Sequence, residues 1–203
     1  MTREKAATNA GRDLCAGKVP AAGGESVRLH LGCGGDYWPG YINIDVSPSS
    51  SADLKMDYLG IDTLFAPGTV REIVMIHSLN YLTLWQARDF FRITHRLLED
   101  QGVLLLETVN LEKAIRQIER GIGNLDEYLE GVRALHAFGP EQLRNREVHT
   151  PNAFSWTPWH ITEELSAAGF HNVLVLPART HAPWRDMRIE AYKGNIRTEA
   201  GHE

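Results

Sequence analysis

Apolar residues along this chain follow two spacings, and the change between them predicts where its strands and helices lie. In 187–192 apolar residues alternate with larger polar ones, as in an antiparallel strand that has one exposed face. Elsewhere, short apolar runs bounded by glycine or polar residues are typical of buried strands. Such runs fall at 27–31, 41–45, 72–79, 103–106 and 172–176.

Between these strands the spacing of apolar side chains becomes helical. Apolar residues recur at every third or fourth position in 84–98, which predicts an amphipathic helix packed on a sheet, ended by Gly102. Thr157 and Pro158 suit the N-cap and the first turn of a later helix, which Gly169 ends. Further helices are predicted at 111–120 and 125–135. Strands that alternate with helices predict an α/β fold.

A glycine turn between the first two strands carries the clearest chemical signal. The first strand leads directly into Gly32, Gly34 and Gly35, and the second ends on Asp45. Glycine lets the backbone turn sharply beside a ligand, and a carboxylate at a strand tip can accept hydrogen bonds from ribose hydroxyls. The segment therefore predicts a pocket for an adenosine-containing ligand.

The spacing within this segment separates two kinds of adenosine ligand. Dinucleotide sites have a third glycine opening a helix and an acid about 20 residues further on. Here Tyr37 occupies the third position, and Asp45 follows Gly32 by only 13 positions. This leaves no room for a full crossover helix that would hold a pyrophosphate. The spacing favours S-adenosylmethionine (SAM) over a nicotinamide cofactor.

Several segments in order resemble the class I SAM-dependent methyltransferases, in the subgroup with a short first crossover. These segments are LHLGCG at 29–34, PGYINIDVSP at 39–48, DLKMD at 53–57, EIVMIHSL at 72–79 and LEDQGVLLL at 98–106. The resemblance implies a Rossmann-like fold: a mostly parallel seven-stranded sheet with a C-terminal antiparallel hairpin. It implies one domain over 26–193, whose residues 111–157 form a substrate-side cap and loop. We expect residues 1–25 to be a flexible arm and 194–203 a flexible tail.

The resemblance also assigns roles around the cofactor. Gly32, Gly34 and Gly35 would line the methionine and ribose of SAM, and Asp45 would accept from the ribose hydroxyls. Asp57, with Tyr58, would meet the adenine, although Asp in that position is also common as a turn or helix-capping residue. His77, at the end of the fourth strand, would lie near the methionine part.

Three histidines are candidates for a catalytic base, because an acceptor hydroxyl needs one. His77 leads, and His149 and His181 lie in loops expected on the acceptor side. Many relatives have H-x-L-E-H where this chain has His77, Asn80 and Tyr81. This departure keeps open the alternative of a catalytically silent SAM-binding regulator or partner protein.

Tyr81, Trp156 and Arg185 are the candidate contacts for the acceptor. Trp156 could offer an aromatic face to a sugar, and Arg185 could grip a phosphate or carboxylate. The alternatives are a tryptophan that only packs and an arginine that only fixes its hairpin. By resemblance, relatives with a similar C-terminal pattern are often associated with bacterial glycan or secondary-metabolite assembly. We therefore expect a small-molecule, glycan-precursor or otherwise sugar-like acceptor, methylated at oxygen or nitrogen.

The composition of the chain limits which partners, metal sites and locations we expect. The 203 residues suit one domain, and the net charge of −5 argues against a nucleic-acid partner. Two cysteines without a CxxC pair and dispersed histidines predict neither a disulfide framework nor a metal site. No apolar run is long enough to span a membrane, so we expect a cytoplasmic protein. A homodimer is left open.

Overall fold

The computed structural model describes residues 26–137 and 151–194. The expected N-terminal arm and nearly all of the expected tail therefore lie outside the described residues. The strands are β1 (Val27–Leu31), β2 (Ile42–Asp45), β3 (Leu54–Lys55), β4 (Val70–Ile76), β5 (Leu98–Val109), β6 (His171–Pro177) and β7 (Asp186–Tyr192). The helices are α1 (Leu84–Leu97), α2 (Leu111–Arg120), α3 (Leu125–His136) and α5 (Pro158–Ala167), with 3-10 turns η2 (Tyr58–Thr63) and η3 (Leu79–Tyr81).

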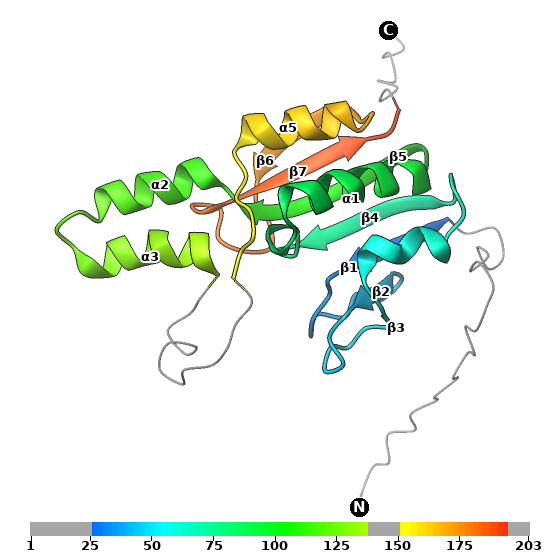
Figure 1. Cartoon of the computed structure of the whole chain (residues 1–203), viewed down its shortest axis with the longest axis horizontal. Helices are drawn as coiled ribbons and strands as arrows, with labels where there is room; N and C mark the ends of the chain where they lie inside the picture. The colour runs from blue at the N-terminus through cyan, green and yellow to red at the C-terminus, as the bar shows by residue number, and fades with distance from the viewer. Residues whose placement is uncertain (1–25, 138–150, 195–203) are drawn as a thin grey trace, which may run out of the picture.

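The seven strands form one sheet in the order β3-β2-β1-β4-β5-β7-β6 (Figure 1). Neighbours from β3 to β5 pair in parallel, whereas β7 pairs antiparallel with both β5 and β6. The expected Rossmann-like sheet with a C-terminal antiparallel hairpin is confirmed. Its parallel strands bring their carboxyl ends to one edge, which is where open α/β sheets bind ligands.

Helix α1 and strand β5 follow one another more closely than the sequence suggested. Thr83 and Gln86 form a capping box that begins α1, which ends at Leu97. Gly102 does not end this helix, because it lies within β5. There the backbone bends, with Gln101 at φ 66°, and a Cβ at position 102 would lie 2.8 Å from the carbonyl oxygen of Glu99. Glycine at this position serves a bend in the strand.

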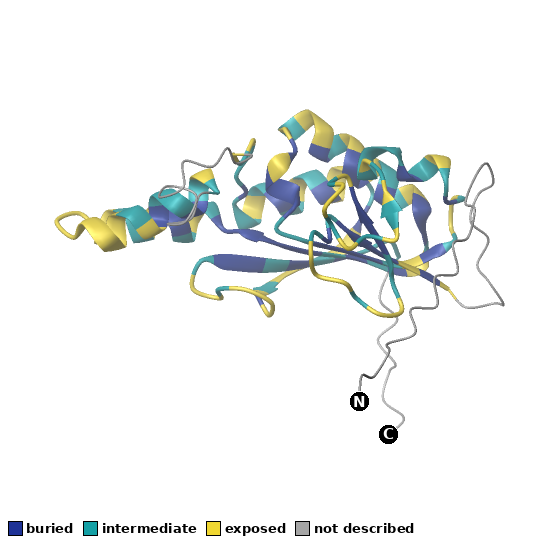
Figure 2. Ribbon diagram, turned by 90° about the horizontal axis from the view of Figure 1, so that it is seen from below, coloured by how far each residue is buried: buried dark blue, intermediate teal, exposed yellow. Residues whose placement is uncertain are grey.

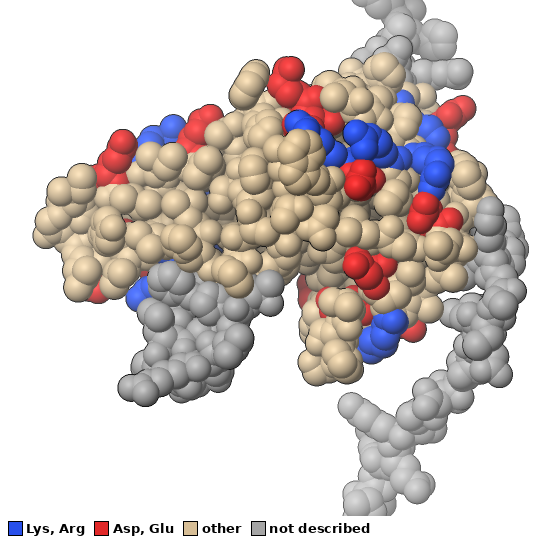
Figure 3. Space-filling view, viewed as in Figure 1, with Lys and Arg blue, Asp and Glu red and all other residues tan. Residues whose placement is uncertain are grey.

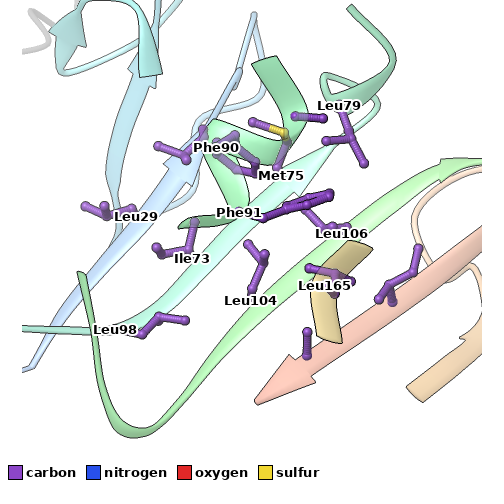
Figure 4. Packing of buried hydrophobic residues seen from close by; sticks show 14 of the residues in the cluster. Leu29, Ile73, Met75, Leu79, Phe90, Phe91, Leu98, Leu104, Leu106 and Leu165 are labelled. Carbon is purple, nitrogen blue, oxygen red and sulfur yellow. The ribbon is translucent and has the colours of Figure 1, made fainter. Parts of the chain in front are cut away.

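The hydrophobic core lies between the sheet and the helices on one of its faces (Figure 2). Phe90 and Phe91 of α1 pack with Leu29, Ile73 and Leu104 of the central strands (Figure 4). Leu165 of α5 joins the same cluster, so α1 and α5 cover the same face. Among the residues that the structure describes, no helix covers the opposite face. Side chains there are largely polar, as for Arg28, Glu72, Arg188 and Glu190.

Helices α2 and α3 form a hairpin that projects from one end of the sheet (Figure 1). Asn110 and Asn124 cap their first turns by accepting from backbone amides. The two helices approach closely at Gly131, where a Cβ would lie 2.6 Å from Cγ1 of Ile118. The expected helices in the proposed cap region therefore form and pack mainly on each other.

On the face drawn in Figure 3, basic side chains lie in a row across the upper right, with acidic side chains beside them. Along α1, Arg88 pairs with Glu164, Arg92 with Asp89, and Arg96 with Asp62. Each of these three arginines therefore has a carboxylate partner. No helix among the described residues is long and apolar enough to cross a membrane.

Candidate functional site

A cleft of about 610 Å³ opens at the carboxyl ends of β1, β2 and β4. Its size falls within the range of small-molecule sites, about 300–1,000 Å³. Residues from the glycine turn, from the end of β2 and from the β4 turn meet in it. They are Gly32, Gly34, Asp45, Val46, Ser47, Tyr58, Ile76, His77, Ser78, Tyr81 and Ala137.

Gly32 forms the tightest point of this cleft. Its φ is 66°, and its backbone N–H donates to the carbonyl of Ile44 at 2.8 Å. Ser78 donates from Oγ to the carbonyl of Gly32 at 3.1 Å. A Cβ at position 32 would lie 2.5 Å from Cβ of Ser78. The glycine is required both by its left-handed conformation and by the close approach of the β4 turn.

Asp45 lies at the end of β2 with its carboxylate turned toward the glycine turn. Oδ2 accepts the N–H of Gly34 at 2.8 Å, and Oδ1 accepts the N–H of Ser47 at 2.7 Å. A carboxylate has about four lone-pair sites, so each oxygen can accept one further hydrogen bond. Asp45 thus braces the turn and retains acceptor capacity at the cleft.

The expected adenine-side residues separate in the structure. Tyr58 lines the cleft, and its hydroxyl donates to the carbonyl of Ser78 at 3.4 Å. Burial, with the nearby carboxylates of Asp57 and Asp45, raises the pKa of Tyr58 to about 12, so its hydroxyl stays protonated. Asp57 caps η2 by accepting the N–H of Leu59 at 2.9 Å. Neither Asp57 nor Gly35 is among the residues lining the cleft.

His77 reaches the cleft from a left-handed position, φ 53°, directly after β4. Its Nε2 lies 2.9 Å from Oδ2 of Asp186, a residue 109 positions away whose side chain is fully buried. Arg185 donates to both oxygens of the same carboxylate, at 2.7 and 2.8 Å. Burial opposes ionisation of Asp186, but the hydrogen bonds from His77 and Arg185 outweigh it and lower the pKa of Asp186 to about 2. A carboxylate that stays ionised therefore orients His77.

The lowered pKa of Asp186 predicts a loss of stability in acid. Its folded value of about 2 lies below the ordinary 3.8, so the ionised group stabilises the fold above about pH 4 and this contribution disappears as the pH falls toward 2. Asp186→Asn is expected to lower the thermal midpoint most near neutrality, and the difference from the parent should narrow in acid. Circular dichroism melts from pH 7 to 2 measure this. Asp36→Asn, which removes an exposed carboxylate, is the control, and a difference independent of pH would contradict the prediction.

The structure brings two of the three candidate histidines together. The rings of His77 and His181 lie 4.4 Å apart, edge to face at 75°. Burial and the neighbouring His77 lower the pKa of His181, which favours its neutral form. His149 lies outside the described residues.

Of the three expected acceptor contacts, only Tyr81 lines the cleft. Its side chain is 44% exposed. Trp156 is 0% exposed and packs against Phe91 and Phe154 in the core, so it offers no ring face to an acceptor. The expectation of an aromatic platform at Trp156 is wrong, because the buried ring packs on Phe91 and Phe154 and also on His160 of α5. Arg185 has its guanidinium engaged by Asp186, which matches the hairpin-fixing alternative.

Three polar residues of this site were not among the sequence candidates: Ser78, Glu107 and Asp186. Ser78 bonds the glycine turn and lines the cleft. The side chains of Glu107 and Asp186 are both 0% exposed, and both residues face the loop between β6 and β7. Glu107 directly follows the apolar run of β5, and an acid in such a place was a usable signal.

Comparison with known proteins gives the fold a name. No protein-family model matches the sequence, and no curated protein does. A SAM-dependent methyltransferase from Archaeoglobus fulgidus is similar in structure, with a TM-score of 0.57 and 12% identity over 84% of this chain and 87% of that one. A possible histamine N-methyltransferase from Thermotoga maritima gives 0.54 and 12% over 83% of both chains.

A third similar structure holds the cofactor itself. Phosphoethanolamine N-methyltransferase 2 from Haemonchus contortus, in complex with SAM, gives a TM-score of 0.51 and 10% identity over 84% of this chain. The alignment covers 49% of that protein, so this chain spans about half of its length. With the sheet order described above, these likenesses show that the chain has the fold of the class I SAM-dependent methyltransferases.

Proposed function

We propose that this chain is a SAM-dependent methyltransferase that acts on a small-molecule or sugar-like acceptor at oxygen or nitrogen. The observation that carries the proposal is the composition of one cleft. A glycine turn braced by Asp45 forms one side, and a histidine oriented by a buried carboxylate forms the other. The methyltransferase fold supports the same conclusion.

The residues of the cleft fit SAM. Asp45 keeps lone pairs for two ribose hydroxyls, and Gly32 leaves the floor of the cleft without a side chain. Tyr58, whose ring packs edge to face with that of Phe90, adds a protonated hydroxyl to the cleft. When bound, SAM would supply a methyl group on a sulfonium. The chain's own task is then to hold the acceptor in line with that methyl and to remove a proton.

His77 has the geometry for the proton step. Because Asp186 is ionised at neutral pH, the shared proton resides on Nε2 of His77, where the carboxylate accepts it. Nδ1 is then the nitrogen with a free lone pair, and it can take the proton of an acceptor hydroxyl. The neutral neighbour His181 adds no positive charge that would oppose this transfer. An amine acceptor would need less help.

Calorimetric titration with SAM and with S-adenosylhomocysteine tests the cofactor assignment. Release of S-adenosylhomocysteine in the presence of a panel of small alcohols, sugars and amines tests the reaction. Absence of binding to either compound at millimolar concentration would overturn the proposal.

Asp45→Ala is expected to weaken SAM binding by about 1–3 kcal/mol, because it removes the acceptor for the ribose hydroxyls and loosens the turn. The same titration measures this change. Asp36→Ala is the matched control, because Asp36 is an exposed carboxylate in the same turn that does not line the cleft. Unchanged affinity in Asp45→Ala would show that another group holds the ribose.

A catalytically silent SAM-binding protein is the second candidate. The replacement of the relatives' Glu and His by Asn80 and Tyr81 favours it. Asn80 is buried and accepts from Thr108, which is a structural role. Tight SAM binding with no S-adenosylhomocysteine released across the whole panel would select this alternative. Cytoplasmic location stays a prediction from the sequence, association with bacterial glycan or secondary-metabolite assembly stays an expectation from the resemblance, and a homodimer stays open.

A further inference from the structure

Glu107 is a buried carboxylate next to the candidate site that the proposed reaction does not use. It lies in β5, between β4 and β7, and its side chain is 0% exposed. Its oxygens accept the N–H groups of Arg179 at 2.9 Å and Thr180 at 3.0 Å. Arg188 approaches the same carboxylate at 3.4 Å. Burial of this charge is compensated by three donors.

The backbone of Glu107 makes a second contact that concerns the site directly. Its carbonyl accepts the N–H of His77 at 2.8 Å. The side chain holds Arg179 and Thr180, the two residues immediately before His181. Glu107 therefore holds both chain segments that carry the two histidine rings: His77 through its backbone carbonyl, and the residues before His181 through its side chain.

We propose that Glu107 is a positioning residue that sets the His181 ring against the His77 ring. The loop 178–185 has further anchors at Ala182, on the carboxylate of Asp186 at 3.3 Å, and at Pro183, whose carbonyl accepts from Lys113 at 2.6 Å. Arg185 is also held, by Asn110 and by Asp186. All of these lie after His181 in the chain. Glu107 is the anchor before it, so the position of His181 depends on this carboxylate. A catalytic role for the His77–His181 ring pair rests on the proposed function. The positioning of His181 by Glu107 does not.

The titration of His181 provides the test, measured by NMR on protein carrying 15N-labelled histidine. Its ring contacts that of His77, and its pKa is lowered chiefly by burial. The charges of Asp186, Arg185 and Glu107 also act on this pKa. In Glu107→Gln an NH2 group replaces one of the two carboxylate oxygens. This group cannot accept the backbone N–H of Arg179 or Thr180 that faces it, so we expect the loop to be released. Loss of the Glu107 charge by itself lowers the pKa of His181, whereas release from burial raises it. The readout in this variant is therefore the contact shift from the His77 ring, which should disappear.

Glu190→Gln is the matched control. Glu190 is a carboxylate on the neighbouring strand β7 that pairs with the same Arg188 and with Tyr192, but not with the loop. Its substitution should leave the His181 titration at the parent value. A contact shift that persists in folded Glu107→Gln, or the same loss of it in both variants, would overturn the proposal.

A second pair of variants tests the loop without altering the core. Thr180→Pro removes the N–H that donates to Glu107, and Thr180→Ala keeps it. Only the proline variant should raise the pKa of His181, and equal titrations in the two would contradict the proposal. SAM affinity should be unchanged in all four variants. Because none of these measurements needs methyl transfer, a parent protein without turnover would count against the proposed function and leave this inference intact.

Discussion

Gly32→Ala is expected to lower the free energy of unfolding by about 2–5 kcal/mol. A left-handed conformation costs a residue with a Cβ about 1–2 kcal/mol, and forcing side chains apart adds about 1–3 kcal/mol. Both costs apply here, since φ is 66° and the new Cβ would meet Ser78. Urea denaturation followed by tryptophan fluorescence measures the change.

Gly34→Ala separates the two contributions. Gly34 has a similar φ of 54°, but nothing lies within 4 Å of a Cβ built on it. Only the conformational cost of about 1–2 kcal/mol is therefore expected. SAM affinity should fall in Gly32→Ala, because the Ser78 contact that shapes the cleft is displaced. Equal destabilisation by the two substitutions would show that the contact with the β4 turn is unimportant.

His77→Asn is expected to slow methyl transfer to a hydroxyl acceptor by about 10²–10⁴-fold, the usual contribution of a general base. Asparagine suits the test because it tolerates the left-handed backbone that His77 adopts. SAM affinity should be retained, since the proposed role concerns the acceptor. Steady-state release of S-adenosylhomocysteine, with the acceptor found in the panel, measures the rate.

The control for this substitution is His171→Gln, which changes an exposed histidine on the edge strand β6. Its rate should match that of the parent. A rate for His77→Asn within a few-fold of the parent would contradict the assignment of His77 as the base.

Much of the fold could be predicted because its signals are local. Helical spacing in 84–98 and the Thr157-Pro158 start both depend on residues within one element, and both helices form. The glycine turn was visible for the same reason: Gly32 and Asp45 are 13 positions apart and share one supersecondary unit. Packing then brings them into the same cleft.

The contacts that complete the site are not local, and the sequence did not reveal them. Asp186 meets His77 across 109 positions, so no spacing rule links the two residues. The helix 84–98 was predicted within one residue of α1, but the role of Gly102 was wrong: it resembles a helix stop, although it serves a strand bend. Trp156 was misjudged because an aromatic residue in an irregular segment can face either solvent or core, and only tertiary packing decides.

Within the described residues, helices cover only one face of the sheet, and we expect this to affect which substitutions the strands tolerate. Along β7 the burial alternates from one residue to the next: Met187, Ile189 and Ala191 are buried, whereas Arg188, Glu190 and Tyr192 are only partly buried. Tolerance to mutation in this strand should therefore alternate with the parity of the residue number. A randomised library of 187–192 would recover many residue types at the even positions and few at the odd ones.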